Sequence, residues 1–278
     1  MSLNTRIRQF YDRSTPLWLK AWGEHMHHGY YGPQGRESNY HFQAQVDLLE
    51  EILRWGHIEK SNRILDAGCG VGGSARFLAR RYDARVLGVT LSPVQAKQAQ
   101  EYSRRAGLED KLTFEVRDMM QLTSKDGPFD LIWSMESAEH IEDKAAMLQM
   151  FYELLSPGGC LLMATWCRRE APPGLSRRDE RLLGKIYRYY HLPPMISRER
   201  YRGLAEEAGF SRIETDDWTQ SVTPFWGAVI HRALQWESLK GLLKSGWSTM
   251  KGAWAMRYMR QGYRQGIINY AVIQAHKP

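Results

Sequence analysis

Short apolar runs alternate with longer amphipathic stretches through the middle of the chain. The apolar runs have the length of buried strands and lie at 63–68, 84–90, 111–116, 129–134 and 159–166. Stretches with helical spacing follow two of these runs, at 72–82 and 92–107. Strands that alternate with helices predict βαβ units and a parallel sheet. Two further strands are expected at 211–218 and 266–276, which brings the expected sheet to seven strands.

Three segments do not follow this alternation. Residues 1–60 are predicted to form helices that break at "HHGYYGPQGRESN", and we expect them to be a helical lid on a core of residues 61–278. Residues 167–200 are basic and punctuated by proline, whereas residues 222–264 carry apolar side chains at helical spacing. We expect these two segments to be insertions that form a helical cap over the ends of the strands.

The composition changes this picture little. With 43% hydrophobic and 25% charged residues, the chain resembles an average globular protein. It contains no apolar run of about 18 residues, so a transmembrane helix is not expected. The first residues lack the apolar segment of a secretory signal. Three cysteines without a CxxC pair argue against a disulfide framework, and we expect a cytosolic protein.

The charge balance is basic, with a formal net charge of +7 and a pI of about 9.3. The 31 acidic residues are dispersed among the 38 basic ones, and there is no arginine-rich tail or zinc-finger spacing. We therefore expect no nucleic-acid partner. An ordinary basic surface and a surface that meets anionic lipid head groups or RNA remain open as alternatives.

The segment "ILDAGCGVGG" places a strand, an aspartate and several glycines before a helical stretch. Glycines at this point allow a tight turn and bring backbone N–H groups close to a ligand. Gly68, Gly70 and Gly73 also satisfy the dinucleotide pattern. However, Asp66 lies two residues before the first glycine, where a carboxylate suits a cationic amino group better than a pyrophosphate. The acid that an NAD site needs about 20 residues later is missing, because the second strand ends in "GVTLSPVQ".

The segment "DAGCGVG" resembles motif I of the class I S-adenosylmethionine-dependent methyltransferases. The resemblance implies a Rossmann-like sheet of seven mostly parallel strands and S-adenosylmethionine as cofactor, with S-adenosylhomocysteine as product. It implies that Asp66, Gly68, Gly70 and Gly72 bind this cofactor. "LLSPGG" resembles the turn into the fifth strand of these enzymes.

Three further segments carry the same resemblance. "VRDMM" resembles the third-strand signature, in which Asp118, followed by Met119, meets the adenine amino group. "FDLIWSMESAEH" resembles the fourth-strand signature and contains Ser134, also expected at the cofactor. "VTLSPVQ" resembles a subset that includes cyclopropane-synthase-like enzymes, which implies ribose contacts from a further set of residues, Thr90, Leu91 and Gln95.

A closer resemblance covers nearly the whole chain, from about Phe10 to Pro278. "YDRSTPLWLKAWGEHMHHGYYG", "IWSMESAEHIEDK", "TPFWGAVIHRALQW" and "SGWSTMKGA" are similar to the γ-tocopherol methyltransferase family. This implies methyl transfer to an aromatic ring carbon of a prenylated phenol. Relatives in the family methylate the nitrogen of indole alkaloids, so N- or O-methylation of another hydrophobic small molecule is the alternative. Plant enzymes of this type carry a transit peptide, so we expect a bacterial, cyanobacterial source or a trimmed chain.

Methylation of a ring carbon beside a phenol is helped by a base that ionises the hydroxyl near neutral pH. Glu136, Glu139 and His140 follow the fourth strand, at the edge where open α/β sheets bind ligands. Resemblance to cyclopropane synthases implies that Glu139 faces the acceptor. An ordinary charged helix start is the alternative for this segment, and His140 is equally open to a catalytic or a structural role.

The segment "WGEHMHHGYYG" contains three histidines whose spacing differs from the H-x₃-H pair of zinc sites, so no metal site is expected. The resemblance implies that this segment closes over the cofactor, with Tyr30 or Tyr31 near its methionine end. It also implies that His28 faces the acceptor as a candidate base, alone or relayed with Glu139. A loop without a role is the alternative.

The last predicted helical segment combines tryptophans with basic side chains. Trp226, Trp236, Trp247 and Trp254 lie among lysines and arginines at helical spacing. Four such tryptophans suit a channel for a hydrophobic acceptor whose rim touches an anionic membrane as a peripheral contact. An ordinary helical core accounts for the same pattern, and the oligomeric state is not readable from it.

Overall fold

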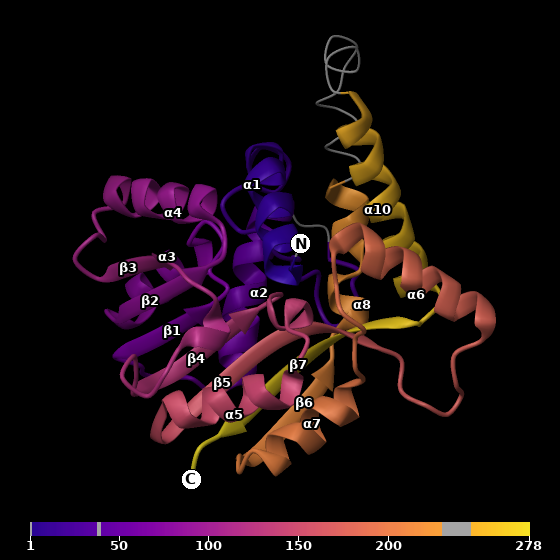
Figure 1. Cartoon of the computed structure of the whole chain (residues 1–278). Helices are drawn as coiled ribbons and strands as arrows, with labels where there is room; N and C mark the ends of the chain where they lie inside the picture. The colour runs from indigo at the N-terminus through magenta and orange to yellow at the C-terminus, as the bar shows by residue number, and fades with distance from the viewer. Residues whose placement is uncertain (1, 38–39, 230–245) are drawn as a thin grey trace.

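The computed structural model describes residues 2–37, 40–229 and 246–278 (Figure 1). It contains the seven expected strands: β1 (Arg63–Ala67), β2 (Arg85–Thr90), β3 (Leu112–Val116), β4 (Phe129–Met135), β5 (Leu155–Arg168), β6 (Ser211–Asp217) and β7 (Ile268–His276). The largest difference from the prediction is the start of β5, expected at residue 159. The strand begins earlier because Leu155 already pairs with Phe129 of β4, before an irregularity in the register that precedes Cys160.

The strands form one mixed sheet in the order β3-β2-β1-β4-β5-β7-β6. The first five strands of this order are parallel, and β7 is antiparallel to both β5 and β6. The prediction of a mostly parallel, Rossmann-like sheet is therefore confirmed. The order reverses between β1 and β4, and the carboxyl ends of neighbouring strands diverge there to leave space for a ligand.

Side chains alternate between the two faces of this sheet, and helices cover both. Ile64 and Leu131 point into the core beneath α2 (His41–Trp55) and α3 (Gly73–Tyr82). Leu65 and Ile132, one residue further along, point into a second core beneath α5 (Lys144–Leu154) and α7 (Arg198–Glu207). Burial on both faces is why these strands are almost continuously apolar in sequence.

The remaining helices extend the core at its ligand-binding edge (Figure 1). They are α1 (Leu3–Trp22), α6 (Arg177–Tyr190), α8 (Thr219–Val222) and α10 (Gly246–Arg264), with the 3-10 turns η1 (Met119–Gln121) and η2 (Ala138–His140). Helix α4 (Pro93–Arg105) instead packs against β2 and β3 and covers the same face of the sheet as α2 and α3. The predicted break between the first two helices is found, because α1 ends at Trp22 and α2 begins at His41. None of the helices in the described ranges is long and apolar enough to span a bilayer.

The described parts of the two expected insertions contain helices. The first contains α6, and the second contains α10, which lies beside α6 (Figure 1). Helix α8 ends at Val222, the first residue of the second insertion. Trp226 is fully buried. Trp236 lies outside the described residues, and for Trp247 and Trp254 the described part is the backbone of α10.

Candidate active site

A cleft of about 960 Å³ opens at the carboxyl ends of β1, β2 and β4. This volume includes the open mouth of the cleft, and its position is the reversal point of the sheet, where open α/β sheets bind ligands. Nine residues that the sequence analysis singled out line its walls: Asp66, Gly68, Gly70, Thr90, Leu91, Gln95, Asp118, Met119 and His140. The cleft therefore assembles the strand ends that the motifs pointed to.

Asp66 supplies an unpaired buried acceptor at one end of this cleft. Its side chain is 1% exposed, and its Oδ2 has no hydrogen-bond partner among the described residues. Burial raises the pKa of Asp66 to about 7, although a backbone hydrogen bond from Ala75 and the charge of Arg76 act in the opposite direction. A buried carboxylate with an unused oxygen fits a cationic amino group, as on the methionine part of S-adenosylmethionine.

The glycine loop leaves backbone exposed to the cleft. Gly70 has φ 52°, and a Cβ built there meets no atom within 4 Å, so a ligand can approach its backbone closely. Gly68 has φ 97°, and a Cβ there would lie 2.3 Å from Cβ of Ser137. Gly72 lies behind the loop instead, where a Cβ would lie 2.8 Å from the Phe114 ring. Its role is to let α3 pack against the sheet.

The opposite end of the cleft carries groups suited to an adenosine. The hydroxyl of Thr90 donates to Oε1 of Gln95 at 2.9 Å, which holds both side chains at the end of β2. Asp118 caps η1 by accepting from the Met120 backbone at 3.0 Å, and its Oδ2 accepts from Nδ2 of Asn4 at 2.6 Å. A hydroxyl, an amide and a carboxylate fit a ribose and an adenine amino group, so the residues present suit S-adenosylmethionine.

Helix α1 forms part of the cleft wall. Asn4, Ile7 and Tyr11 lie along it and face the cleft. The hydroxyl of Tyr11 lies 2.8 Å from Nε2 of His140. Burial raises the pKa of Tyr11 and lowers that of His140 to about 3, so both groups are neutral at physiological pH. The phenol of Tyr11 can then donate to the imidazole, which makes His140 a poor proton acceptor.

The histidine-rich segment supplies the adjoining wall through Glu24, His25, Met26 and His27. Gln45 of α2 donates to the carbonyls of His25 and His27, the latter at 2.9 Å. Glu24 is paired with Nη2 of Arg76 at 2.6 Å. These contacts connect the segment to α2 and α3, beside the glycine loop.

Several residues expected at the site lie outside the walls of this cleft. The hydroxyl of Tyr30 donates to Glu51 at 3.4 Å, and its ring packs against Trp218. Ser134 is buried behind the wall, with its Oγ 3.0 Å from Oγ of Ser137. The turn between β4 and η2 therefore presents Ser137 to the cleft, whereas Ser134 within β4 does not line it.

Glu139 also lies outside the cleft walls. Its side chain is 1% exposed, and its Oε2 accepts from the Thr165 hydroxyl at 3.0 Å. Burial raises the pKa of Glu139 to about 8, and the charge of Glu136 raises it further. This carboxyl group is therefore protonated at neutral pH and faces the interior of the protein.

Glu136 is the functional candidate that the sequence analysis did not select. It lies at the end of β4 with φ 48°, an unusual value for a residue with a side chain, and it lines the cleft. Its Oε2 accepts from Nδ1 of His28 at 2.9 Å, and its Oε1 accepts from the His28 backbone at 2.7 Å. Tyr270 donates to the same Oε1 at 3.0 Å. The carboxylate next to His28 thus belongs to Glu136 and not to Glu139.

The electrostatics of the two glutamates are opposite. Burial acts to raise the pKa of Glu136, but the neighbouring His28 and His27 outweigh burial, and the net shift is downward. Glu136 is therefore ionised where Glu139 is neutral. An ionised carboxylate on Nδ1 of an imidazole holds the proton on that nitrogen and leaves Nε2 available as a proton acceptor.

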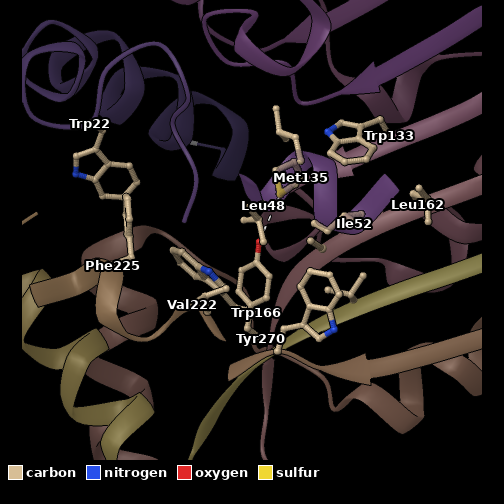
Figure 2. Close-up of a cluster of buried hydrophobic side chains, with 14 of the residues drawn as sticks. Trp22, Leu48, Ile52, Trp133, Met135, Leu162, Trp166, Val222, Phe225 and Tyr270 are labelled. Atoms are coloured by element: carbon tan, nitrogen blue, oxygen red, sulfur yellow. Dashed lines mark hydrogen bonds between the residues drawn. The ribbon is translucent and has the colours of Figure 1, made fainter. Parts of the chain in front are cut away.

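Five aromatic rings surround the imidazole of His28, and we call them the aromatic cluster: Trp166, Phe225, Trp226, Tyr263 and Tyr270. Their centroids lie between 5.0 and 6.0 Å from that of His28. Figure 2 shows Trp166, Phe225 and Tyr270 among their buried neighbours, with the Tyr270 hydroxyl directed at Met135.

Four buried polar atoms in the aromatic cluster have no hydrogen-bond partner among the described residues. They are Nε2 of His28, Nε1 of Trp166, Nε1 of Trp226 and Oη of Tyr263. Buried groups of this kind are normally satisfied, so unused donors and acceptors that gather around one imidazole suit a bound molecule with polar atoms of its own.

The chain matches known methyltransferases over its whole length. A methyltransferase domain family matches residues 64–159. The chloroplastic tocopherol O-methyltransferase of Arabidopsis thaliana is 38% identical over 289 residues, covering 100% of this chain and 83% of that protein. Norajmaline N-methyltransferase of Rauvolfia serpentina is 30% identical, covering 98% of this chain and 97% of the relative.

Among solved structures, the 4+2 cyclase SpnF superposes with a TM-score of 0.82 at 25% identity, covering 99% of this chain and 97% of that one. A cyclase on this fold shows that the architecture alone does not define the reaction. The sequence relatives are more specific, and they agree with the cofactor chemistry of the cleft. The chain uses S-adenosylmethionine and belongs to the tocopherol methyltransferase family of class I methyltransferases.

Proposed function

We propose that the protein transfers a methyl group from S-adenosylmethionine to a ring carbon of a tocopherol-like prenylated phenol. The observation that carries this proposal is the position of Glu136, which lines the cofactor cleft and binds His28 in the aromatic cluster. Donor and acceptor would thus lie on the two sides of one carboxylate. The tocopherol O-methyltransferase of Arabidopsis thaliana supports the class of acceptor, and the choice between ring carbon and oxygen is decided by the assay below.

In this proposal His28 is the general base and Glu136 orients it. Because Glu136 accepts the Nδ1 proton, the lone pair of His28 remains on Nε2, which faces the aromatic rings without a partner. The phenol O–H of an acceptor in the cluster donates its proton to Nε2, and the resulting charge raises electron density at the adjacent ring carbon. S-adenosylmethionine supplies an electrophilic methyl group on its sulfonium. As the new carbon–carbon bond forms, the carbon–sulfur bond to the methyl group breaks. The ring carbon then releases its hydrogen as a proton to solvent, and the phenol oxygen recovers a proton from protonated His28, which restores the base.

The surrounding side chains exclude water and orient the ring. Trp166, Trp226 and Tyr263 are almost fully buried and present polar atoms that an acceptor oxygen can engage. A dry aromatic site also strengthens the interaction between the imidazole and the phenol. The prenyl tail would follow the apolar side chains of α6 and of residues 255–264 of α10.

The test is a transfer assay with methyl-labelled S-adenosylmethionine and γ- and δ-tocopherol, in parallel with indole and amine alkaloids. We expect label in the tocopherols, and carbon NMR of the product should show an aryl methyl group. A methoxy signal would replace the proposal by O-methylation. Transfer to an alkaloid alone would retain the cofactor assignment and move the reaction to nitrogen, as in norajmaline N-methyltransferase.

A further inference from the structure

Helix α6 carries a continuous row of exposed cations, which we call the α6 stripe: Arg177, Arg178, Arg181, Lys185 and Arg188. At 3.6 residues per turn these positions lie within an arc of about 100°. The acids of the helix lie outside that arc. Asp179 closes the capping box with Ser176 and lies 3.4 Å from Arg169. The stripe therefore presents one sign of charge.

Nothing in the described part of the chain neutralises this stripe. Its arginines form no ion pair with the described residues. Arg181 donates to the Arg177 carbonyl at 3.2 Å, and Nζ of Lys185 lies 5.2 Å from the centre of the Tyr258 ring. Like charges one turn apart repel and lower the stability of a helix, and an anionic surface would remove that repulsion.

The opposite face of α6 lies against the proposed acceptor site. Leu183, Ile186 and Tyr190 are buried there, and the Tyr190 ring meets Trp166 of the aromatic cluster edge-on at 5.6 Å. Helix α10 lies alongside α6 (Figure 1) and carries the exposed Arg260 and Arg264 near its end. A single helix thickness therefore separates the stripe from the aromatic cluster.

We propose that the α6 stripe docks the protein on a bilayer that contains anionic lipids, so that a lipid-dissolved acceptor enters the aromatic cluster beside it. Each basic side chain near an anionic surface strengthens binding, and the effect is confined to a few ångströms of the head groups. The choice of a lipid surface rather than a nucleic acid rests on the proposed function, because a prenylated acceptor is dissolved in membranes.

The test is co-sedimentation of the full chain with phosphatidylcholine vesicles that contain or lack phosphatidylglycerol. The variant is Arg177→Gln/Arg181→Gln/Arg188→Gln, and the matched control removes three exposed charges from another face, as Arg80→Gln/Arg81→Gln/Arg85→Gln. We expect the stripe variant to bind anionic vesicles about a hundredfold more weakly, at roughly fivefold per charge, and the control to bind like the wild type. Cofactor affinity should be unchanged in both, which shows that they are folded.

Equal loss in both triple variants, or equal binding of the wild type to neutral vesicles, would overturn the proposal. So would an oligonucleotide that binds through the stripe while anionic vesicles do not. The vesicle measurement needs neither acceptor nor turnover, so it stands apart from the proposed reaction. A second measurement connects vesicle binding with the proposed reaction. The stripe variant should methylate an acceptor dissolved in neutral detergent at the wild-type rate, and it should lose methylation of an acceptor dissolved in anionic vesicles.

Discussion

The cofactor cleft and the aromatic cluster share Glu136, yet they are built in opposite ways. The cleft is open to solvent, and the ends of β1 and β3 supply Asp66, Gly70 and Asp118 to its walls. The cluster is closed and aromatic, and its rings come from β5, β7, α10 and the helical residues 225–226 after α8. In the proposed function, hydrogen bonds and charge would hold the donor in the cleft, whereas the aromatic cluster would act by packing and exclusion of water.

This difference separates binding from chemistry. Changes in the cleft should alter cofactor affinity and leave the proton transfer intact. Changes at His28 should alter turnover and leave cofactor affinity nearly intact, because His28 is not among the residues that line the cleft. Glu136 does line it, so its variants should alter both.

The largest effect is expected from His28→Ala and Glu136→Gln. Because they remove the proposed base and the carboxylate that orients it, kcat should fall by about 10²–10⁴. Glu139→Gln is the matched control, since Glu139 is a protonated acid at neutral pH and glutamine preserves its shape and charge. Turnover and cofactor titration on all three variants measure this. A slow Glu139→Gln beside a fast Glu136→Gln would exchange the roles of the two glutamates.

The next effect concerns Asp66 and pH. The pKa of about 7 for free Asp66 means that its carboxylate is ionised at about pH 8 and protonated at about pH 6. A bound cation lowers this pKa. Cofactor affinity is therefore at its full value above about pH 7 and is lost as the pH falls through the pKa of Asp66. Calorimetry should show Kd rising about tenfold over this range. Asp66→Asn should bind about 10–100-fold more weakly at pH 8 and show a flat profile; a profile that still slopes would assign the titration elsewhere.

The smallest effect should come from Gly70→Ala, compared with Gly107→Ala. Both glycines have positive φ, 52° and 64°, and a Cβ at either meets no atom within 4 Å. Both variants should lose about 1 kcal/mol of unfolding free energy from backbone strain. Only Gly70 lines the cleft, so only its variant should also weaken cofactor binding several-fold. Equal cofactor affinity in the two would mean that the bare backbone at Gly70 is not approached by the ligand.

The two regions also differ in how much the sequence could predict. The strands were predictable because each is a short apolar run of residues. The Asp66 motif was predictable because its aspartate and glycines lie within a few consecutive residues. Glu136 could not be separated from Glu139 in the same way, because a left-handed backbone at the strand end turns one glutamate to the cleft and leaves the other in the core. The expectation of Tyr30 or Tyr31 at the cofactor came from the family resemblance. The position of Tyr30 itself depends on contacts with Glu51 and Trp218, which are distant in sequence.

The order of the strands has a consequence for synthesis of the chain on the ribosome. β6 pairs with β7 and with no other strand of the described sheet, and β7 also covers the edge of β5. Until β7 has left the exit tunnel, β6 has no neighbour, β5 has a bare edge and Tyr270 cannot reach Glu136. The cofactor loops are complete much earlier. A nascent chain would therefore acquire the ability to hold the methyl donor well before it could use it.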